Sequence, residues 1–175
     1  ADRRILLVGF GSVARAVAAR LAPFEVEVTA VARHPRTQDG IAVHAMEDLP
    51  HLLPDADIVI LTVPLNDDTE HLFDAGTLAL MADGALLVNI ARGRVVDTDA
   101  LLAELEAHRL RAALDVTDPE PLPADHPLWH APNVLITAHQ GGNTTATDPR
   151  TARLVRRQIL HLLAGEEPEN VIRRP

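Results

Sequence analysis

Apolar residues recur along the chain in short continuous runs, and segments with helical spacing separate most of these runs. A continuous apolar run bounded by glycine, proline or polar residues indicates a strand buried on both faces of a sheet. Such runs alternating with helical segments predict an α/β fold, with a parallel sheet and helices on both faces. The six expected strands are residues 4–11, 26–32, 57–64, 84–91, 111–116 and 133–138.

Three segments show the spacing of amphipathic helices. In the first, Val13, Val17 and Leu21 fall on one stripe, which is typical of a helix packed against a sheet. The second has Asp97 or Thr98 at its start, and both side chains are good N-caps. The three helical segments are residues 12–23, 97–108 and 145–165, the last followed by a short tail.

Composition narrows the class of protein. Of 175 residues, 47% are hydrophobic and 2% are aromatic, which is typical of a globular chain with an aliphatic core. A net charge of −9 argues against a nucleic-acid partner, and no apolar run reaches the roughly 18 residues of a membrane span. With no cysteine and no signal-peptide pattern, we expect a cytoplasmic protein.

A glycine pattern joins the first expected strand to the first expected helix. Gly9 and Gly11 are followed by Ala14, in the order Gly-x-Gly-x-x-Ala. The first glycine permits a tight turn, the second lets a pyrophosphate approach the backbone, and the small third residue lets helix and strand pack closely. This context predicts a dinucleotide-binding domain of the Rossmann type. The alternative is a tight turn that serves packing alone.

The end of the second expected strand bears on the choice of cofactor. Sites for NAD usually place an acidic residue there to bind the ribose 2′-hydroxyl, whereas Ala32 stands at this place and Arg33, His34 and Arg36 follow. An arginine beside a small residue suits a 2′-phosphate, so we expect NADP, with NAD as the alternative cofactor. An exposed basic loop without a ligand would show the same residues.

Three ionisable residues follow the fourth, fifth and sixth expected strands, namely Arg92, Glu120 and His139. In open α/β sheets, ligands bind beyond the carboxyl ends of the strands, so all three share one edge with the glycine turn. Each one alone has a simpler interpretation, as a solvated or structural side chain. Because all three are expected beside the predicted cofactor-binding turn, a role in a binding or catalytic site is favoured over a structural role.

A metal site is not expected from the sequence. The absence of cysteine excludes thiolate ligands. Asp125, His126 and His130 are close in sequence, but they lie in a Pro-rich loop, which makes a poor cage for a metal ion.

Together the three side chains that follow the strands suit the reduction of a ketone to an alcohol. A nicotinamide supplies the hydride, and a protonated histidine supplies the proton. A carboxylate beside the ring stabilises the imidazolium, while an arginine binds a substrate carboxylate through two parallel hydrogen bonds. His139, Glu120 and Arg92 would take these parts. Asp115, at the end of the fifth strand, would face the nicotinamide or be an ordinary strand-end acid.

The order of motifs resembles one family over nearly the whole chain. The segments "GFGSVA", "VPLNDDT", "NIARGRVVDTDAL", "ALDVTDPEPLPADHPLW" and "NVLITAHQGG" look like the nucleotide-binding domain of the D-isomer-specific 2-hydroxyacid dehydrogenases. The resemblance implies hydride transfer between a nicotinamide and a 2-keto or 2-hydroxy acid. It places the catalytic Arg, Glu and His at Arg92, Glu120 and His139. It places cofactor contacts at Gly9, Gly11, Ser12, Val13, Ala14, Arg33, Pro64, Ile90, Ala91, Asp115 and Gly142.

The resemblance also has departures and further implications. Ala138 stands where the family usually has proline, and Ala32 replaces the acid of its NAD-type members. Family members carry a substrate-binding domain before the glycine turn, so we expect residues 1–175 to be one dinucleotide-binding domain, with a C-terminal helix and tail over residues 144–175. Such a domain would bind cofactor but turn over poorly alone. The family implies a homodimer.

Two other functions remain open from the sequence. A non-catalytic dinucleotide-binding sensor or interaction module would share the glycine turn, although it would not need an acid–base histidine. A different Rossmann-like enzyme, such as a methyltransferase, would share the strand order but finds no support in the Arg, Glu and His set.

Overall fold

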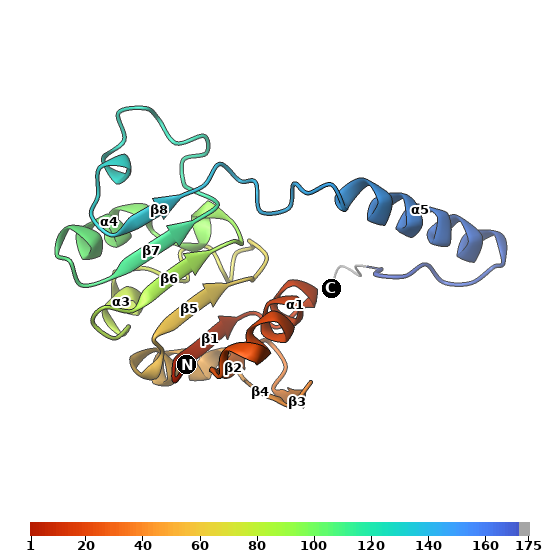
Figure 1. Ribbon diagram of the computed structural model, residues 1–175, viewed down its shortest axis with the longest axis horizontal. Helices are drawn as coiled ribbons and strands as arrows, with labels where there is room; N and C mark the ends of the chain where they lie inside the picture. The colour runs from red at the N-terminus through yellow and green to blue at the C-terminus, as the bar shows by residue number, and fades with distance from the viewer. Residues whose placement is uncertain (172–175) are drawn as a thin grey trace. The chain divides into compact units, whose positions relative to one another are not determined.

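The computed structural model describes residues 1–171, which form a first compact unit, Ala1–His139, and a second that begins at Gln140. The first unit contains one eight-stranded sheet with the order β3-β4-β2-β1-β5-β6-β7-β8 (Figure 1). The strands are β1 (Arg4–Val8), β2 (Glu27–Val31), β3 (Arg36–Gln38), β4 (Ile41–His44), β5 (Ile58–Leu61), β6 (Leu86–Asn89), β7 (Arg111–Leu114) and β8 (Val134–Ile136).

The six strands expected from the sequence are confirmed as β1, β2 and β5–β8, and they pair in parallel. The β3–β4 hairpin was not expected, because Arg33, His34 and Arg36 were considered only as contacts for a 2′-phosphate or, alternatively, as an exposed basic loop. β3 pairs antiparallel with β4, while β4 continues the parallel sheet beside β2. Asp39 and Gly40 form the two-residue turn, both with positive φ, as hairpin turns of this length favour.

Helices cover both faces of the sheet, which confirms the doubly wound Rossmann-type fold (Figure 1). On one face α1 packs its small side chains against Ile5 and Leu7 of β1. On the other face the leucines of three further helices pack with Leu6 and Val8. Burial on both faces explains why the central strands are apolar at successive positions. The helices of this unit are α1 (Ser12–Leu21), α2 (Leu49–Leu52), α3 (Ala75–Ala79) and α4 (Thr98–Glu106).

The expected buried stripe of α1 was partly wrong. Val13 is 53% exposed, and the buried positions of the helix are Ala14 and Ala18, at 0% and 8% exposure. Val17 and Leu21 are partly buried beside them. Alanine side chains let the helix axis approach the sheet closely, so small residues rather than large ones mark the inner face.

The start of α4 is as expected. The Asp97 side chain accepts a hydrogen bond from Ala100 N–H at 3.0 Å, so Asp97 is the N-cap and Thr98 is the first residue of the helix. The cap satisfies one of the backbone N–H groups that a helix leaves free at its start.

The second unit consists of α5 (Thr147–Leu163) and a tail that turns back along it. The helix was expected over residues 145–165, and its observed ends lie two residues inside that range. Most of its large apolar side chains are exposed, Leu154 is half-buried, and none of its residues is buried. None of the helices within residues 1–171 combines the length and apolar character that crossing a membrane requires.

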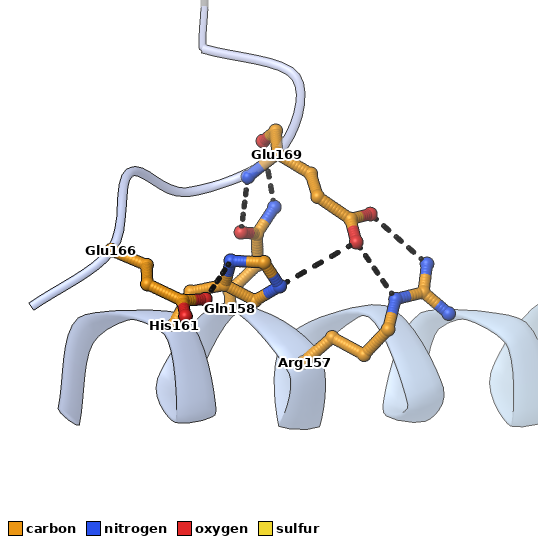
Figure 2. A network of polar contacts seen from close by, with 5 residues as sticks. All are labelled: Arg157, Gln158, His161, Glu166 and Glu169. Carbon is orange, nitrogen blue, oxygen red and sulfur yellow. Dashed lines mark hydrogen bonds and ion pairs between the residues drawn. The ribbon is translucent and has the colours of Figure 1, made fainter. Parts of the chain in front are cut away.

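Polar contacts hold the tail against the last turns of α5 (Figure 2). Arg157 donates from Nε and Nη2 to the two carboxylate oxygens of Glu169, each at 3.2 Å. The side-chain amide of Gln158 exchanges two hydrogen bonds with the backbone of Glu169, at 2.7 and 2.8 Å. His161 lies 3.3 Å from Glu166 through Nδ1. Side-chain contacts therefore order this tail, which lacks regular secondary structure.

Candidate active site

The glycine turn lies where β1 meets α1. Gly9 has a φ of +91°, and a Cβ added there would lie 3.0 Å from both Thr62 Oγ1 and Val63 Cγ1. Thr62 also donates a hydrogen bond to the carbonyl of Gly9 at 3.1 Å. Gly11 differs, because a Cβ there would meet nothing within 4 Å. The first glycine is thus required by the protein itself, while the space over the second is open to a ligand.

A cleft of about 680 Å³ opens beside this turn. Four of the residues predicted to contact the cofactor line it, namely Gly9, Gly11, Arg33 and Pro64. They come from three separate segments, which follow β1, β2 and β5, so the cleft lies at the carboxyl ends of these strands. The other lining residues are Phe10, Ala32, His34, Arg36, Met46, Glu47, Thr62, Val63, Asn66, Asp68, Thr69 and Leu72.

The two arginines of the cleft differ in how they are held. Arg36 donates to the carbonyls of His34 at 2.7 Å and Phe10 at 3.0 Å, and its guanidinium lies 5.8 Å from the centre of the Phe10 ring. Arg33 is exposed, and within residues 1–171 it makes no hydrogen bond or ion pair. Arg36 therefore braces the glycine turn, and Arg33 is the guanidinium available to a ligand.

The remaining predicted cofactor contacts lie outside the cleft lining. Ser12 and Val13 are exposed at the start of α1, whereas Ala14 is fully buried on the inner face of the same helix. Ile90 and Ala91 follow β6, where Ile90 is exposed and Ala91 is buried. Gly142 belongs to the second unit, so its contact with the cofactor stays a prediction.

The structure brings together two of the three predicted catalytic residues. Glu120 Oε1 lies 2.6 Å from His139 Nδ1, and the two side chains are 39% and 48% exposed. A carboxylate can only accept, so a neutral ring must donate from Nδ1, which leaves Nε2 as an acceptor. His139 has a positive φ of 53°, a conformation that is uncommon for residues other than glycine and that recurs at functional sites.

Arg92 follows β6, at the carboxyl ends of the strands, and its hydrogen bonds are separate from those of Glu120 and His139. Within residues 1–171 no hydrogen bond or ion pair joins it to Glu120 or His139. Its guanidinium donates to the carbonyl of Ala91 at 2.6 Å. Asn89, only 1% exposed, donates from its amide to the carbonyl of Arg92 at 2.9 Å and accepts from Ala91 N–H at 3.0 Å. The buried amide of Asn89 therefore fixes the backbone that carries Arg92.

Asp115 lies at the end of β7, as predicted, and is half-buried. Thr137, just past β8, donates a hydrogen bond to its carboxylate at 2.6 Å. This contact ties together the two strand ends that lead to Glu120 and His139.

Sequence reasoning missed Asn89, Thr62 and Gly93. A Cβ at Gly93 would lie 1.9 Å from the carbonyl oxygen of Thr117, so only glycine fits there. An amide closing the apolar run "LLVN" was the available signal for Asn89. His126, considered for a metal site, instead accepts from Leu128 N–H at 3.2 Å.

The resolved pKa shifts lie away from this site. The backbone N–H of Arg4 and the guanidinium of Arg3 hold the pKa of the Asp57 carboxyl below its usual value, at the amino end of β5. The backbone N–H of Thr77 lowers the pKa of Asp74, the N-cap of α3. These carboxylates stabilise the scaffold and take no part in the site.

Comparison with known proteins identifies the family. Residues 1–141 match the model of the D-isomer specific 2-hydroxyacid dehydrogenase NAD-binding domain. The chain belongs to this family. A glyoxylate reductase from Thermofilum pendens is 39% identical over 173 residues, which cover 97% of this chain and 51% of that protein. The glyoxylate/hydroxypyruvate reductase B of Citrobacter koseri is 36% identical over 170 residues, 95% of this chain and 52% of that protein.

Solved structures of the dehydrogenase family agree with this fold. The D-isomer specific 2-hydroxyacid dehydrogenase from Xanthobacter autotrophicus Py2, in complex with NADPH and MES, superposes with a TM-score of 0.89 at 36% identity. The match covers 98% of this chain and 71% of that one. The chain spans about half the length of the curated relatives named above. The predicted family and its NAD-binding domain are therefore confirmed.

Proposed function

We propose that this chain is the cofactor-binding and acid–base part of an NADP-preferring 2-hydroxyacid dehydrogenase, which interconverts a 2-keto acid and a 2-hydroxy acid. The observation that carries the proposal is the contact of 2.6 Å between Glu120 and His139, on the sheet edge that also holds the glycine turn. A module that only senses a dinucleotide has no use for such an acid–base pair.

The cleft fits a dinucleotide. The turn from Gly9 to Gly11 leaves open space above its backbone, and α1 begins directly after it with free N–H groups and the positive end of its dipole. Both features favour a pyrophosphate at the start of α1. Arg33 would then contact a 2′-phosphate at the end of β2. A bound nicotinamide would supply the hydride of the reaction.

The preference for NADP rests on the exposed guanidinium of Arg33 and on the small side chain of Ala32. One charge-assisted hydrogen bond contributes roughly 1.5–3 kcal/mol, which corresponds to about a ten- to hundredfold preference for the phosphorylated cofactor. Glu47 and Asp68 also line the cleft, so Arg33 must offset nearby negative charge as well.

In the proposed reduction, His139 donates a proton from Nε2 to the ketone oxygen as that oxygen becomes an alcohol. Glu120 holds the ring through Nδ1 and stabilises the imidazolium before the transfer. Arg92 binds the carboxylate of the substrate, and Asp115 faces the nicotinamide. In the oxidation direction, His139 accepts the proton instead.

The proposal is tested by NADPH oxidation in the presence of glyoxylate and hydroxypyruvate. The chain is assayed alone and joined to the part of the Thermofilum pendens reductase that it does not match. We expect reduction by the joined protein and little by the chain alone. A joined protein that binds NADPH but reduces no 2-keto acid would contradict the proposal.

The matched variant is His139→Gln, which keeps a polar side chain but cannot supply the proton. General acid catalysis contributes about 10²–10⁴-fold, so kcat falls by this amount while NADPH binding is retained. Unchanged turnover would remove His139 from the mechanism. A cytoplasmic homodimer also stays a prediction, and light scattering that shows only monomer would contradict the dimer.

A further inference from the structure

We propose that Thr98 is a positioning residue, which holds the loop of Glu120 so that its carboxylate meets His139. The proposal deepens the proposed function and rests on it for its catalytic meaning. It concerns a side chain at the start of α4 that contacts neither partner of the pair.

The segment that carries Glu120 needs an external support. It follows β7 and runs without regular structure up to the short helical turn at Pro127–Trp129. Glu120 itself is exposed, and so is Pro119 before it. A carboxylate on such a segment keeps a contact of 2.6 Å with His139 only if the backbone close to it is fixed.

Two contacts from the segment that follows Arg92 reach this backbone, and within the loop the hydroxyl of Thr117 also donates to the carbonyl of Pro119 at 3.0 Å. The hydroxyl of Thr98 donates to the carbonyl of Asp118 at 2.8 Å, two residues before Glu120. The Cα of Gly93 packs directly on the peptide between Thr117 and Asp118, as the lack of room for a Cβ shows. Of the two contacts from that segment, only the one made by Thr98 comes from a side chain. It can be removed by substitution without creating a steric clash, whereas any side chain at Gly93 would clash with Thr117.

The position of Thr98 is fixed by the helix to which it belongs. It is the first residue of α4, directly after the N-cap Asp97, and it is half-buried. The same helix anchors Leu101 and Leu105 in the core, at 2% and 0% exposure. The packed core therefore fixes the position of the Thr98 hydroxyl. Its hydrogen bond to the carbonyl of Asp118 in turn restrains the backbone two residues before Glu120.

The tautomer of His139 reports the effect without any need for turnover. With Glu120 in place the neutral ring carries its proton on Nδ1, whereas a free imidazole favours Nε2. Long-range proton–nitrogen NMR of the 175-residue chain distinguishes the two neutral forms, recorded at a pH high enough that the ring signals no longer change with pH. His139→Gln assigns the signal, and Glu120→Ala defines its value when the carboxylate is absent.

We expect Thr98→Val to lower the ratio of Nδ1–H to Nε2–H forms by roughly two- to tenfold, the range for one neutral hydrogen bond. Thr98→Ser, which restores the hydroxyl, returns the ratio to the wild-type value. Thr77→Val is the matched control, because Thr77 is also a half-buried threonine near the start of a helix, α3, away from the site. It leaves the ratio unchanged.

A wild-type ratio in Thr98→Val overturns the proposal, as does a lowered ratio that Thr98→Ser fails to restore. If valine disturbs the start of α4, as circular dichroism would show, Thr98→Ala carries the same expectation. Titration with NADPH separates the two proposals. Failure to bind cofactor contradicts the proposed function, whereas an unchanged tautomer contradicts only the role of Thr98.

Discussion

The proposed cofactor cleft and the proposed acid–base pair of Glu120 and His139 both lie at the carboxyl ends of the strands, but they are built differently. At the cleft the backbone determines the shape, through Gly9 and Gly11 and the start of α1. At the acid–base end two exposed side chains meet, and neighbouring segments hold them in place. The first site is a space that the fold leaves open, and the second is a contact that the fold has to support.

This difference indicates where each part of the site is vulnerable. Changes at the cleft should act on cofactor affinity and leave the rest of the domain intact, if they fill only the open space. Changes behind Arg92 and Glu120 should act on stability and on the acid–base contact together, because there the supports are also packing contacts.

The largest effect is expected at Gly93. In Gly93→Ala the new Cβ would lie 1.9 Å from the Thr117 carbonyl oxygen, so the backbones carrying Arg92 and Glu120 must separate. We expect the free energy of unfolding to fall by about 3 kcal/mol or more, measured by urea denaturation. Gly76→Ala in α3 is the control, and it should raise stability by up to about 1 kcal/mol, because alanine favours a helix.

The two glycines of the turn should respond in opposite ways. Gly9→Ala places a side chain at positive φ against Thr62 and Val63, which lowers the free energy of unfolding by about 1–2 kcal/mol. Gly11→Ala meets open space, so it leaves the melting temperature unchanged and weakens NADPH binding by steric contact with the pyrophosphate. Equal effects of both substitutions on melting would contradict this division.

Substitutions of Arg36 and Arg33 should also differ in their effects on cofactor binding. Arg36→Met removes the hydrogen bonds to Phe10 and His34 and loosens the turn, so NADPH and NADH should both bind several-fold more weakly. Fluorescence titration of both cofactors measures this. A loss confined to NADPH would show that Arg36 binds the 2′-phosphate and would contradict its role as a brace.

The smallest effect concerns the stability of the fold at acid pH. It involves Asp57, which lies at the amino end of β5, away from the proposed site. Arg4 N–H and Arg3 lower the pKa of Asp57 in the folded state, so this carboxylate stabilises the fold above its unfolded value of about 4. The contribution is lost as the pH falls through the lower, folded value. Asp57→Asn should therefore reduce stability slightly at neutral pH, progressively less below about pH 4, and not at all below the folded pKa of Asp57. Denaturation at several pH values tests this, with unchanged cofactor binding expected.

Much of the fold could be predicted because strands buried on both faces are continuous apolar runs in the sequence. The hairpin of β3 and β4 could not be found in this way, since its strands are short and partly exposed at the edge of the sheet. Its turn, Asp39–Gly40, was the stronger signal. The inner face of α1 was misjudged because close packing favours Ala14 and Ala18 over the larger Val13.

The candidate site could be predicted from the sequence where the backbone adopts a conformation that only one type of residue tolerates. Gly9 is such a position, because of its positive φ, whereas the parts of Gly11 and Arg33 in cofactor binding stay predictions. The contacts of Thr98 and Gly93 with the Glu120 loop were beyond sequence reasoning, because they depend on which loop lies against them in three dimensions. The distance in sequence between Thr98 and Asp118 gives no hint of their hydrogen bond.

The central claim is that the cleft beside Gly9 and Gly11 holds NADP through Arg33, and paired titrations test it most directly. NADPH and NADH are titrated into the wild-type chain and into Arg33→Ala, with fluorescence as the readout. We predict tighter binding of NADPH, which falls by about ten- to hundredfold in the variant, and NADH binding that stays unchanged. Equal affinity for both cofactors in the wild-type chain, or binding of neither, would contradict the claim.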